Sequence, residues 1–510
     1  MRWLVFALLT AFIAVVLLTL AHWQLQQHLD AEARATIAAV ARNQAPYRWP
    51  LRDADDVIAG RVFSSAAFHF GDDGVTATSA GGTFEIGLPI AHAIDLSRYG
   101  LLEINVQADA PFTLGLSVRE SLIGEVCAAA SIPIATDNHD VRIDISTFAW
   151  SCSGQAAAVP SRAAMLRLRI DAIGGNSLTL RDVRLAPLRP LRIPLSASEI
   201  PVMPAPSSAD AITDAVLALP DNLSALPVVV LPLQGRDEQM LAARDRILDL
   251  VPAAVLVSTP AVALIAQGES ANAMTQIGES SGASMWSWIA LIGYGASLVW
   301  LCVRHPRNQR ARAACEVVAV LAGPIWLIVG GRLRSGSDPL AMAIICLSMT
   351  YAALLAAQGW RYRTLRIGPL DAWIVPALTV LAGLLVVFVL HRRDAGHAPI
   401  PTHEMLRYAG WVVFQQILIC LVVSDRLARI GLATRWVVLV AATAFALLHV
   451  PNAALSIVTL IGGLAWVWNW RRYRSLLPNI VAHIVCGAIV LHGLPSDWLR
   501  SAEVGARYFL

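Results

Sequence analysis

The chain has 510 residues, of which 56% are hydrophobic and only 15% are charged. This composition excludes a soluble enzyme of ordinary make-up and indicates a membrane protein, so the lipid bilayer is the first expected partner. The formal net charge of +3 is small, and we expect no nucleic-acid partner. Basic residues cluster instead in short loops beside apolar runs, where they indicate membrane topology.

The N-terminal run WLVFALLTAFIAVVLLTLAHW (3–23) is about long enough to span a bilayer. We predict a transmembrane anchor over residues 1–23, and a cleaved signal peptide is the rival interpretation. The run is long for the apolar core of a signal peptide, and no A-x-A cleavage site follows promptly. Residues 24–50 are expected to form a short helical connector.

Residues 51–190 contain short segments in which apolar and polar residues alternate, separated by Gly, Asp, Asn and Pro. This pattern predicts an antiparallel β-sandwich. The segments are GTFEIGLP (82–89), GLLEINVQAD (100–109), FTLGLSVRES (112–121), DVRIDIS (140–146), MLRLRIDAI (165–173) and SLTLRDVRLAPL (177–188). The last of them resembles the final strand of galactose-binding-type jelly rolls. If this half is exported, Cys127 and Cys152 are expected to form a disulfide.

Residues 191–267 are predicted to form a small α/β segment. Two apolar runs, LPVVVLPL (226–233) and AAVLVST (253–259), read as buried strands on either side of the helical segment RDEQMLAARDRILDLV (236–251). We expect this strand–helix–strand unit to be a packing module without chemistry of its own. Residues 268–284 are rich in Gly and Ser and are predicted to be a linker.

Residues 285–495 are predicted to form a polytopic membrane domain, followed by a tail at 496–510. The eight expected spans are 286–303, 314–331, 339–358, 370–390, 405–424, 435–450, 453–470 and 476–493. The basic loops 304–312, 361–366, 425–435 and 471–474 alternate with less basic ones, which predicts that they are cytoplasmic. Loop 391–404, with two arginines on the other side, is an exception. We therefore expect a multi-pass protein of the bacterial inner membrane, with residues 24–284 periplasmic.

Polar residues inside three of the expected spans are the most informative feature of the sequence. Gln415 and Gln416 lie in WVVFQQILICLVV, His449 in FALLHVPN and His483 in LLPNIVAHIVCG. Each polar group inside a membrane must find a partner within the protein, so we predict one site built from three helices. Phe445 lies one turn before His449 on the same helix face.

This arrangement resembles the CPBP family, the intramembrane proteases related to CAAX prenyl endopeptidases and bacteriocin-processing proteins. The family pattern is E-E-x-x-x-R, then F-x-x-x-H, then H-x-x-x-N on successive helices. Phe445 and His449 match the second motif, and His483 matches the start of the third. SLLPNIVAHIV resembles the S-L-x-P-x-x-x-x-H entry to the family's last helix. The resemblance covers about residues 370–493.

Four residues of this sequence differ from the family pattern. Gln415 and Gln416 stand where the family has glutamates, Cys420 where it has an arginine, and Gly487 where it has an asparagine. The family glutamate is thought to activate water as a general base, and a glutamine amide cannot accept that proton. An imidazole titrates near neutral pH, so His449 or His483 is a candidate base. The resemblance assigns catalysis to Gln415, Gln416, His449 and His483, and binding to Phe445 and Asn452.

Two functions remain open from the sequence. The first is a CPBP-like intramembrane endopeptidase that acts on a membrane-associated peptide or protein and has an extracytoplasmic recognition domain. The alternative is an inactive pseudoprotease that serves as a membrane scaffold or binding protein, with the sandwich binding a glycan or a protein partner. Buried glutamines also join helices without any catalytic role. No cofactor is predicted, and no metal site is assigned.

Overall fold

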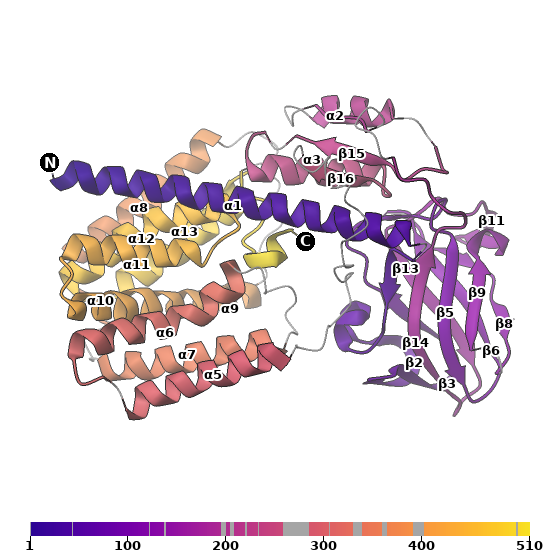
Figure 1. The fold of residues 1–510 in the computed structure, drawn as a ribbon, viewed down its shortest axis with the longest axis horizontal. Coiled ribbons are helices and arrows are strands. Elements are labelled where there is room, and N and C mark those ends of the chain that lie inside the picture. The colour runs from indigo at the N-terminus through magenta and orange to yellow at the C-terminus, as the bar shows by residue number, and fades with distance from the viewer. Residues whose placement is uncertain are drawn as a thin grey trace. The chain divides into compact units, whose positions relative to one another are not determined.

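The computed structural model describes residues 2–509 except 43, 122, 137–138, 195–199, 205–208, 220–221, 233, 259–284, 305, 330–338, 360–364, 391–401 and 496–497. The chain divides into two compact units (Figure 1). One comprises Met1–Leu25, Arg236–Glu238 and Gly282–Leu510, and the other comprises Gln26–Gly235 and Gln239–Ser281. The predicted linker at 268–284 and most of loop 391–404 lie outside the described residues.

Helix α1 (Arg2–Ala41) is one continuous helix of 40 residues, where the sequence predicted an anchor and a separate connector. The stretch contains neither Gly nor Pro, and its second half is rich in alanine, so nothing ends the helix at the membrane surface. Residues Trp3–Ala41 are long and apolar enough to include a membrane span.

Within the described residues, twelve strands form one curled antiparallel sheet with the central order β11-β10-β7-β6-β13-β3-β14-β5-β9. The strands are β1 (Tyr47–Trp49), β2 (Val62–Gly71), β3 (Gly74–Leu88), β5 (Leu101–Ala108), β6 (Phe112–Arg119), β7 (Cys127–Ala129), β8 (Ile132–Ile134), β9 (Asp140–Asp144), β10 (Trp150–Cys152), β11 (Gln155–Ala157), β13 (Met165–Ala172) and β14 (Ser177–Ala186). A short ribbon pairs β4 (Ile94–Asp95) with β12 (Arg162–Ala163). All six strand segments predicted from alternation are confirmed.

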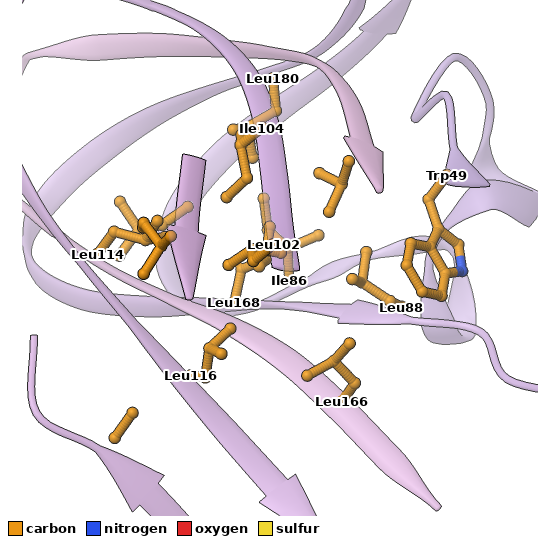
Figure 2. Packing of buried hydrophobic residues seen from close by; sticks show 14 of the residues in the cluster. Trp49, Ile86, Leu88, Leu102, Ile104, Leu114, Leu116, Leu166, Leu168 and Leu180 are labelled. Carbon is orange, nitrogen blue, oxygen red and sulfur yellow. The ribbon is translucent and has the colours of Figure 1, made fainter. Parts of the chain in front are cut away.

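The longest strand, β3, pairs with β2 along one edge and with two different strands along the other edge. The second half of β3 pairs with β13, while its first half pairs with β14. The sequence predicted two separate layers, and the structure instead folds one continuous sheet around a single core. Alternate residues of each strand point inward. Figure 2 shows this core, in which Leu102 and Ile104 of β5 pack with residues of β3, β6 and β13.

Cys127 and Cys152 face each other in register on β7 and β10, and they are disulfide-bonded. The bond lies in the half of the chain for which the sequence suggested it. It joins two short neighbouring strands close to the edge strand β11 of the sheet.

The predicted strand–helix–strand unit is confirmed. β15 (Val228–Leu231) and β16 (Val255–Ser258) pair in parallel, and α3 (Asp237–Leu250) connects them. A further helix, α2 (Ala209–Leu217), was not predicted. The second half of α1 belongs to this module, because its apolar face packs on both strands and Asp30 accepts hydrogen bonds from the backbone and hydroxyl of Ser258.

The C-terminal region is helical, and each of the eight predicted spans corresponds to a described helix. The helices are α5 (Met285–Val303), α6 (Gln309–Val329), α7 (Pro339–Gly359), α8 (Asp371–Leu390), α9 (Thr402–Gln416), α10 (Asp425–Ile430), α11 (Thr434–Leu447), α12 (Ala453–Tyr473) and α13 (Leu477–Gly493). A π-helical segment, Ile417–Ser424, joins α9 to α10. Among the described residues, five helices are long and apolar enough to cross a bilayer, namely α1, α6, α8, the α9–α10 run and α12. This is a multi-pass membrane protein.

Close packing around α12 sets the geometry of the central helices. Gly463 allows α12 to approach α11, since a Cβ added there would lie 3.1 Å from the Cα of Ala442. The π-helical segment is buried from Leu418 to Ser424 and packs against α7, α11 and α12. α13 packs against α8 and α9. The three helices with the predicted polar residues therefore share one core.

Candidate active site

Three of the predicted site residues are buried inside this core. The exposed fractions are 0% for Gln416, 7% for His449 and 6% for His483. Gln416 is the last residue of α9, His449 follows the end of α11, and His483 lies in α13. Gln415 is half-buried, and its side chain makes no hydrogen bond to any residue that the structure describes. The two glutamines thus differ in environment.

The carboxamide of Gln416 is engaged at both ends. Its Nε2 atom donates to Nδ1 of His483 at 3.1 Å, and its Oε1 atom accepts from the thiol of Cys420 at 3.4 Å. The π-helical segment begins at the next residue. π-Helical segments are rare in proteins and frequently occur at functional sites. The local widening of the helix is a feature that the sequence pattern does not predict.

His449 has a defined tautomer. Its Nδ1 atom lies 2.8 Å from the backbone oxygen of Phe445. A carbonyl oxygen only accepts hydrogen bonds, so Nδ1 carries a proton and donates it to that oxygen. In the neutral imidazole, the lone pair is therefore on Nε2. This atom can accept a proton from water or from a substrate.

Aromatic rings hold the two imidazoles in place. The ring of Phe445 makes edge-to-face contacts with His449 at 4.8 Å and with His483 at 5.7 Å between centroids. Trp466 of α12 stacks on His483 with centroids 4.4 Å apart and an interplanar angle of 27°. The predicted convergence of His449 and His483 is therefore mediated by Phe445, which contacts both.

Asn452 has a structural position at the turn after His449. Its Oδ1 atom caps α12 by accepting from the backbone N–H of Leu455, and its Nδ2 atom donates to the backbone oxygen of Ser501 at 2.7 Å. Asn452 is fully buried. The sequence assigned this residue to binding, whereas both ends of its carboxamide are occupied within the protein.

Sequence reasoning assigned no role in the site to several polar residues around it, although it noted Cys420 as a departure from the family pattern. Cys420, Asn479 and Asn469 are buried and hydrogen-bonded to one another or to Gln416. Tyr408 of α9 fills the space beside Gly487, since a Cβ added to that glycine would lie 1.6 Å from the tyrosine oxygen. Asn469 and Asn479 could have been found from the sequence, because each is a polar residue inside an apolar helix. The fit between Tyr408 and Gly487 leaves no signal in the sequence.

Two further carboxylates lie beside the turn that follows His449. Asp237 Oδ1 is 2.9 Å from Nδ1 of His22, and Glu238 Oε1 accepts from the backbone N–H of Ala454 at 3.4 Å. Burial raises the pKa of both carboxyl groups above the ordinary values. The preceding residue, Arg236, places its guanidinium 4.0 Å from the ring centroid of Trp498. We call Arg236–Glu238 the acidic segment.

A buried imidazole with a free lone pair, next to a second imidazole and an amide, defines a candidate hydrolytic site within a multi-pass membrane protein. Residues 412–489 match the family model described as type II CAAX prenyl endopeptidase Rce1-like. The chain therefore contains an Rce1-like domain of the CPBP type, and Gln416, Phe445, His449 and His483 all lie inside it. Comparison with curated proteins and with solved structures gave no significant match.

Proposed function

We propose that this protein is a CPBP-like intramembrane endopeptidase in which His449 acts as the general base. The observation that carries the proposal is the hydrogen bond from His449 Nδ1 to Phe445, which leaves the Nε2 lone pair available. The position of His449 within the Rce1-like domain supports peptide hydrolysis as the reaction. Its substrate would be a membrane-associated peptide or protein, as the depth of the site among apolar helices suggests.

The reaction would proceed by activated water. His449 Nε2 takes a proton from water while the water oxygen bonds to the scissile carbonyl carbon, and the carbonyl oxygen becomes an oxyanion. N–H donors from His483 and Gln416 stabilise that charge, and each such donor is typically worth about 10²–10³-fold in rate. The C–N bond then breaks, and the imidazolium returns its proton to the leaving amine. The products are a carboxylic acid and an amine.

Gln415 and Phe445 have supporting roles in this proposal. The Gln415 amide would hold the substrate backbone, and its half-buried position in the same helix as Gln416 supports this role. Phe445 separates the two imidazoles and gives the substrate an apolar wall. Such positioning contributes to catalysis by holding the reacting atoms in line.

We further propose that residues 24–284 lie on the periplasmic side of a bacterial inner membrane and recognise a glycan or a protein partner. Arg304, which follows α5, and Arg471, in the last turn of α12, support this orientation by the positive-inside rule. The curled sheet is large enough to act as a recognition domain, although its fold alone selects no ligand.

One observation favours a second function, that of a non-catalytic binding protein. Both ends of the Gln416 carboxamide are used in internal hydrogen bonds, and an amide cannot take a proton from water. In this alternative, the same core holds a membrane segment without cleaving it. The two functions differ in whether His449 is needed for bond cleavage.

The test uses the full chain in proteoliposomes with a panel of synthetic transmembrane peptides and one prenylated C-terminal peptide, in water enriched in ¹⁸O. Mass spectrometry detects a new C-terminus that contains one ¹⁸O atom. We expect cleavage by the unmodified protein, retention with His492→Ala on the same helix as His483, and a loss of about 10²-fold or more with His449→Ala. Absence of cleavage, together with cleavage by Gln416→Glu, would establish the binding protein and overturn the endopeptidase.

A further inference from the structure

A continuous chain of buried polar side chains connects His483 to the backbone of α8. It passes from Ala372 through Asn469, Asn479, Cys420 and Gln416. All four side chains in between are fully buried, with no exposed surface. Water therefore does not compete for these hydrogen bonds, and the donor of each bond is decided by its protein partners alone.

The donor-to-acceptor direction of these hydrogen bonds is set at the α8 end of the series. Asn469 Nδ2 lies 3.0 Å from the backbone oxygen of Ala372 and 2.8 Å from Oδ1 of Asn479. A carbonyl oxygen only accepts, so the atom of Asn469 that faces it must be the amide nitrogen. Inverting this amide would place two oxygen acceptors against each other. Asn479 is thereby fixed with its oxygen toward Asn469.

The orientation of Asn479 determines what Cys420 can do. Asn479 Nδ2 donates to the backbone oxygen of Trp466 at 2.8 Å and lies 3.9 Å from Cys420 Sγ. The sulfur therefore accepts from Asn479, and its S–H remains to be donated. The nearest acceptor is Gln416 Oε1 at 3.4 Å, while the oxygen of Trp466 is 3.9 Å away and already accepts from Asn479.

The thiol in turn fixes the amide of Gln416. With Oε1 held by Cys420, the Nε2 atom faces His483 and donates to Nδ1. A ring nitrogen that accepts a hydrogen bond has no proton, so the proton of the neutral His483 imidazole is on Nε2. His449 has the opposite tautomer, with its proton on Nδ1.

We infer that this directed hydrogen-bond chain fixes His483 as the Nε2–H tautomer, and that Cys420, Asn479 and Asn469 are positioning residues which act through Gln416. The two imidazoles thereby have different capacities, since His449 offers a lone pair at Nε2 and His483 offers an N–H. An inverted Gln416 amide would give His483 a lone pair at Nε2 as well. The site would then contain two bases, and no imidazole N–H would remain for a substrate, because the Nδ1–H of His449 is bonded to Phe445.

The catalytic meaning of this arrangement rests on the proposed endopeptidase function, whereas the tautomer itself does not. Cys420→Ser keeps a donor toward Gln416 Oε1. Cys420→Ala removes the donor and leaves the Gln416 amide without a preferred orientation. Both replacements are slightly smaller than cysteine, so they form a matched pair with respect to packing. Asn469→Ala removes the group that sets the direction of the hydrogen bonds, at the far end of the series from His483.

The direct test is ¹⁵N NMR of the full chain labelled with ¹⁵N-histidine in nanodiscs, with the His483 signals assigned from His483→Gln. We expect His483 to show an unprotonated Nδ1 and a protonated Nε2 in the unmodified protein and in Cys420→Ser. In Cys420→Ala and Asn469→Ala, a population with a protonated Nδ1 should appear. A protonated Nδ1 in the unmodified protein, or identical spectra in Cys420→Ala and Cys420→Ser, would overturn the inference.

The kinetic test follows if the unmodified protein cleaves a peptide. Cys420→Ala should lower kcat on the order of tenfold with little change in KM, which is less than the loss of a whole donor. Cys420→Ser should retain most of kcat. Equal kcat values for the two variants would contradict the positioning role. If the unmodified protein cleaves nothing, the proposed function fails, while the NMR measurement still decides the tautomer.

Discussion

The carboxamide of Gln416 donates to Nδ1 of His483 across 3.1 Å, although the two residues lie 67 positions apart in the sequence. This bond joins the end of α9 to the middle of α13, and both side chains are buried. Buried polar groups without a partner cost about 1–3 kcal/mol each. The bond therefore has a stability consequence that can be measured without any knowledge of a substrate.

Replacing Gln416 with methionine should lower the free energy of unfolding by about 1–3 kcal/mol, because His483 Nδ1 and the Cys420 thiol lose their partner. Methionine keeps a similar side-chain volume, so the loss reports the polar contacts rather than a cavity. Reversible SDS denaturation in mixed micelles measures the change. Gln415→Met is the matched control and should shift the free energy by less than about 0.5 kcal/mol. Equal shifts for the two variants would contradict this prediction.

The buried ion pair between Arg426 and Glu316 supplies a second prediction. Arg426 Nε lies 3.0 Å from Glu316 Oε2, and Glu316 also contacts the more exposed Arg312 at 2.8 Å. Glu316→Gln should cost about 3–5 kcal/mol, because it leaves the guanidinium of Arg426 buried without a counter-charge. Arg312→Gln should cost less than about 1 kcal/mol.

The double variant Glu316→Leu/Arg426→Met separates loss of charge from loss of packing. It should recover much of the stability lost in Glu316→Gln, since apolar residues of similar volume often replace a buried ion pair at little cost. A double variant as unstable as Glu316→Gln would show that packing, and not the unpaired charge, causes the loss. The same denaturation assay applies.

The sequence predicted elements well where their signal is local. The helices that correspond to the eight expected spans follow from apolar runs, and the strands from alternation, because each of these patterns depends only on neighbouring residues. Among the described residues of the C-terminal region, only α6, α8, the α9–α10 run and α12 are long and apolar enough to cross a bilayer. The continuity of α1 was not predicted, although no Gly or Pro interrupts Arg2–Ala41. The pairing of β3 with both β13 and β14 was not predictable from local patterns, because it joins segments far apart in the sequence.

In the candidate site too, the residues with a local sequence signal were predictable and those that depend on tertiary packing were not. Gln416, His449 and His483 were identifiable because each is polar within an apolar helix. Their partners were not, since Cys420 and Tyr408 look like ordinary components of apolar helices and only tertiary packing brings them to the site. The acidic segment lies in a different part of the sequence, so its contact with Ala454 could not be inferred from any pattern.

The contact between Tyr408 and Gly487 gives a packing prediction. A Cβ at position 487 would overlap the Tyr408 ring, with its nearest distance 1.6 Å from the hydroxyl oxygen. Gly487→Ala should therefore lower stability by about 1–3 kcal/mol. In a Tyr408→Leu background, the same substitution should cost much less, because the ring is gone. A double-mutant cycle measures this coupling, and additive effects would exclude the proposed overlap.

The acidic segment predicts a dependence of stability on pH. Burial raises the pKa of Glu238 in the folded protein above its ordinary value of about 4, so the folded state binds more protons than the unfolded state between these two values. The stability contributed by this group is therefore fully present below about pH 4 and is lost as the pH rises through the folded-state pKa. Asp237 shifts in the same direction, opposed by its contact with His22.

The groups that face Glu238 include Asp237 on its own helix and Tyr508 in the C-terminal tail, whose pKa is raised by burial and by the two carboxylates. Thermal unfolding of the full chain in detergent should show a midpoint that falls as the pH rises from about 4 toward neutrality. Glu238→Gln removes one titrating group while keeping the acceptor oxygen for Ala454, so its midpoint should fall less steeply. Tyr508→Phe, which leaves both carboxyl groups in place, is the control and should keep most of the slope. A slope unchanged by Glu238→Gln would assign the pH dependence to other groups.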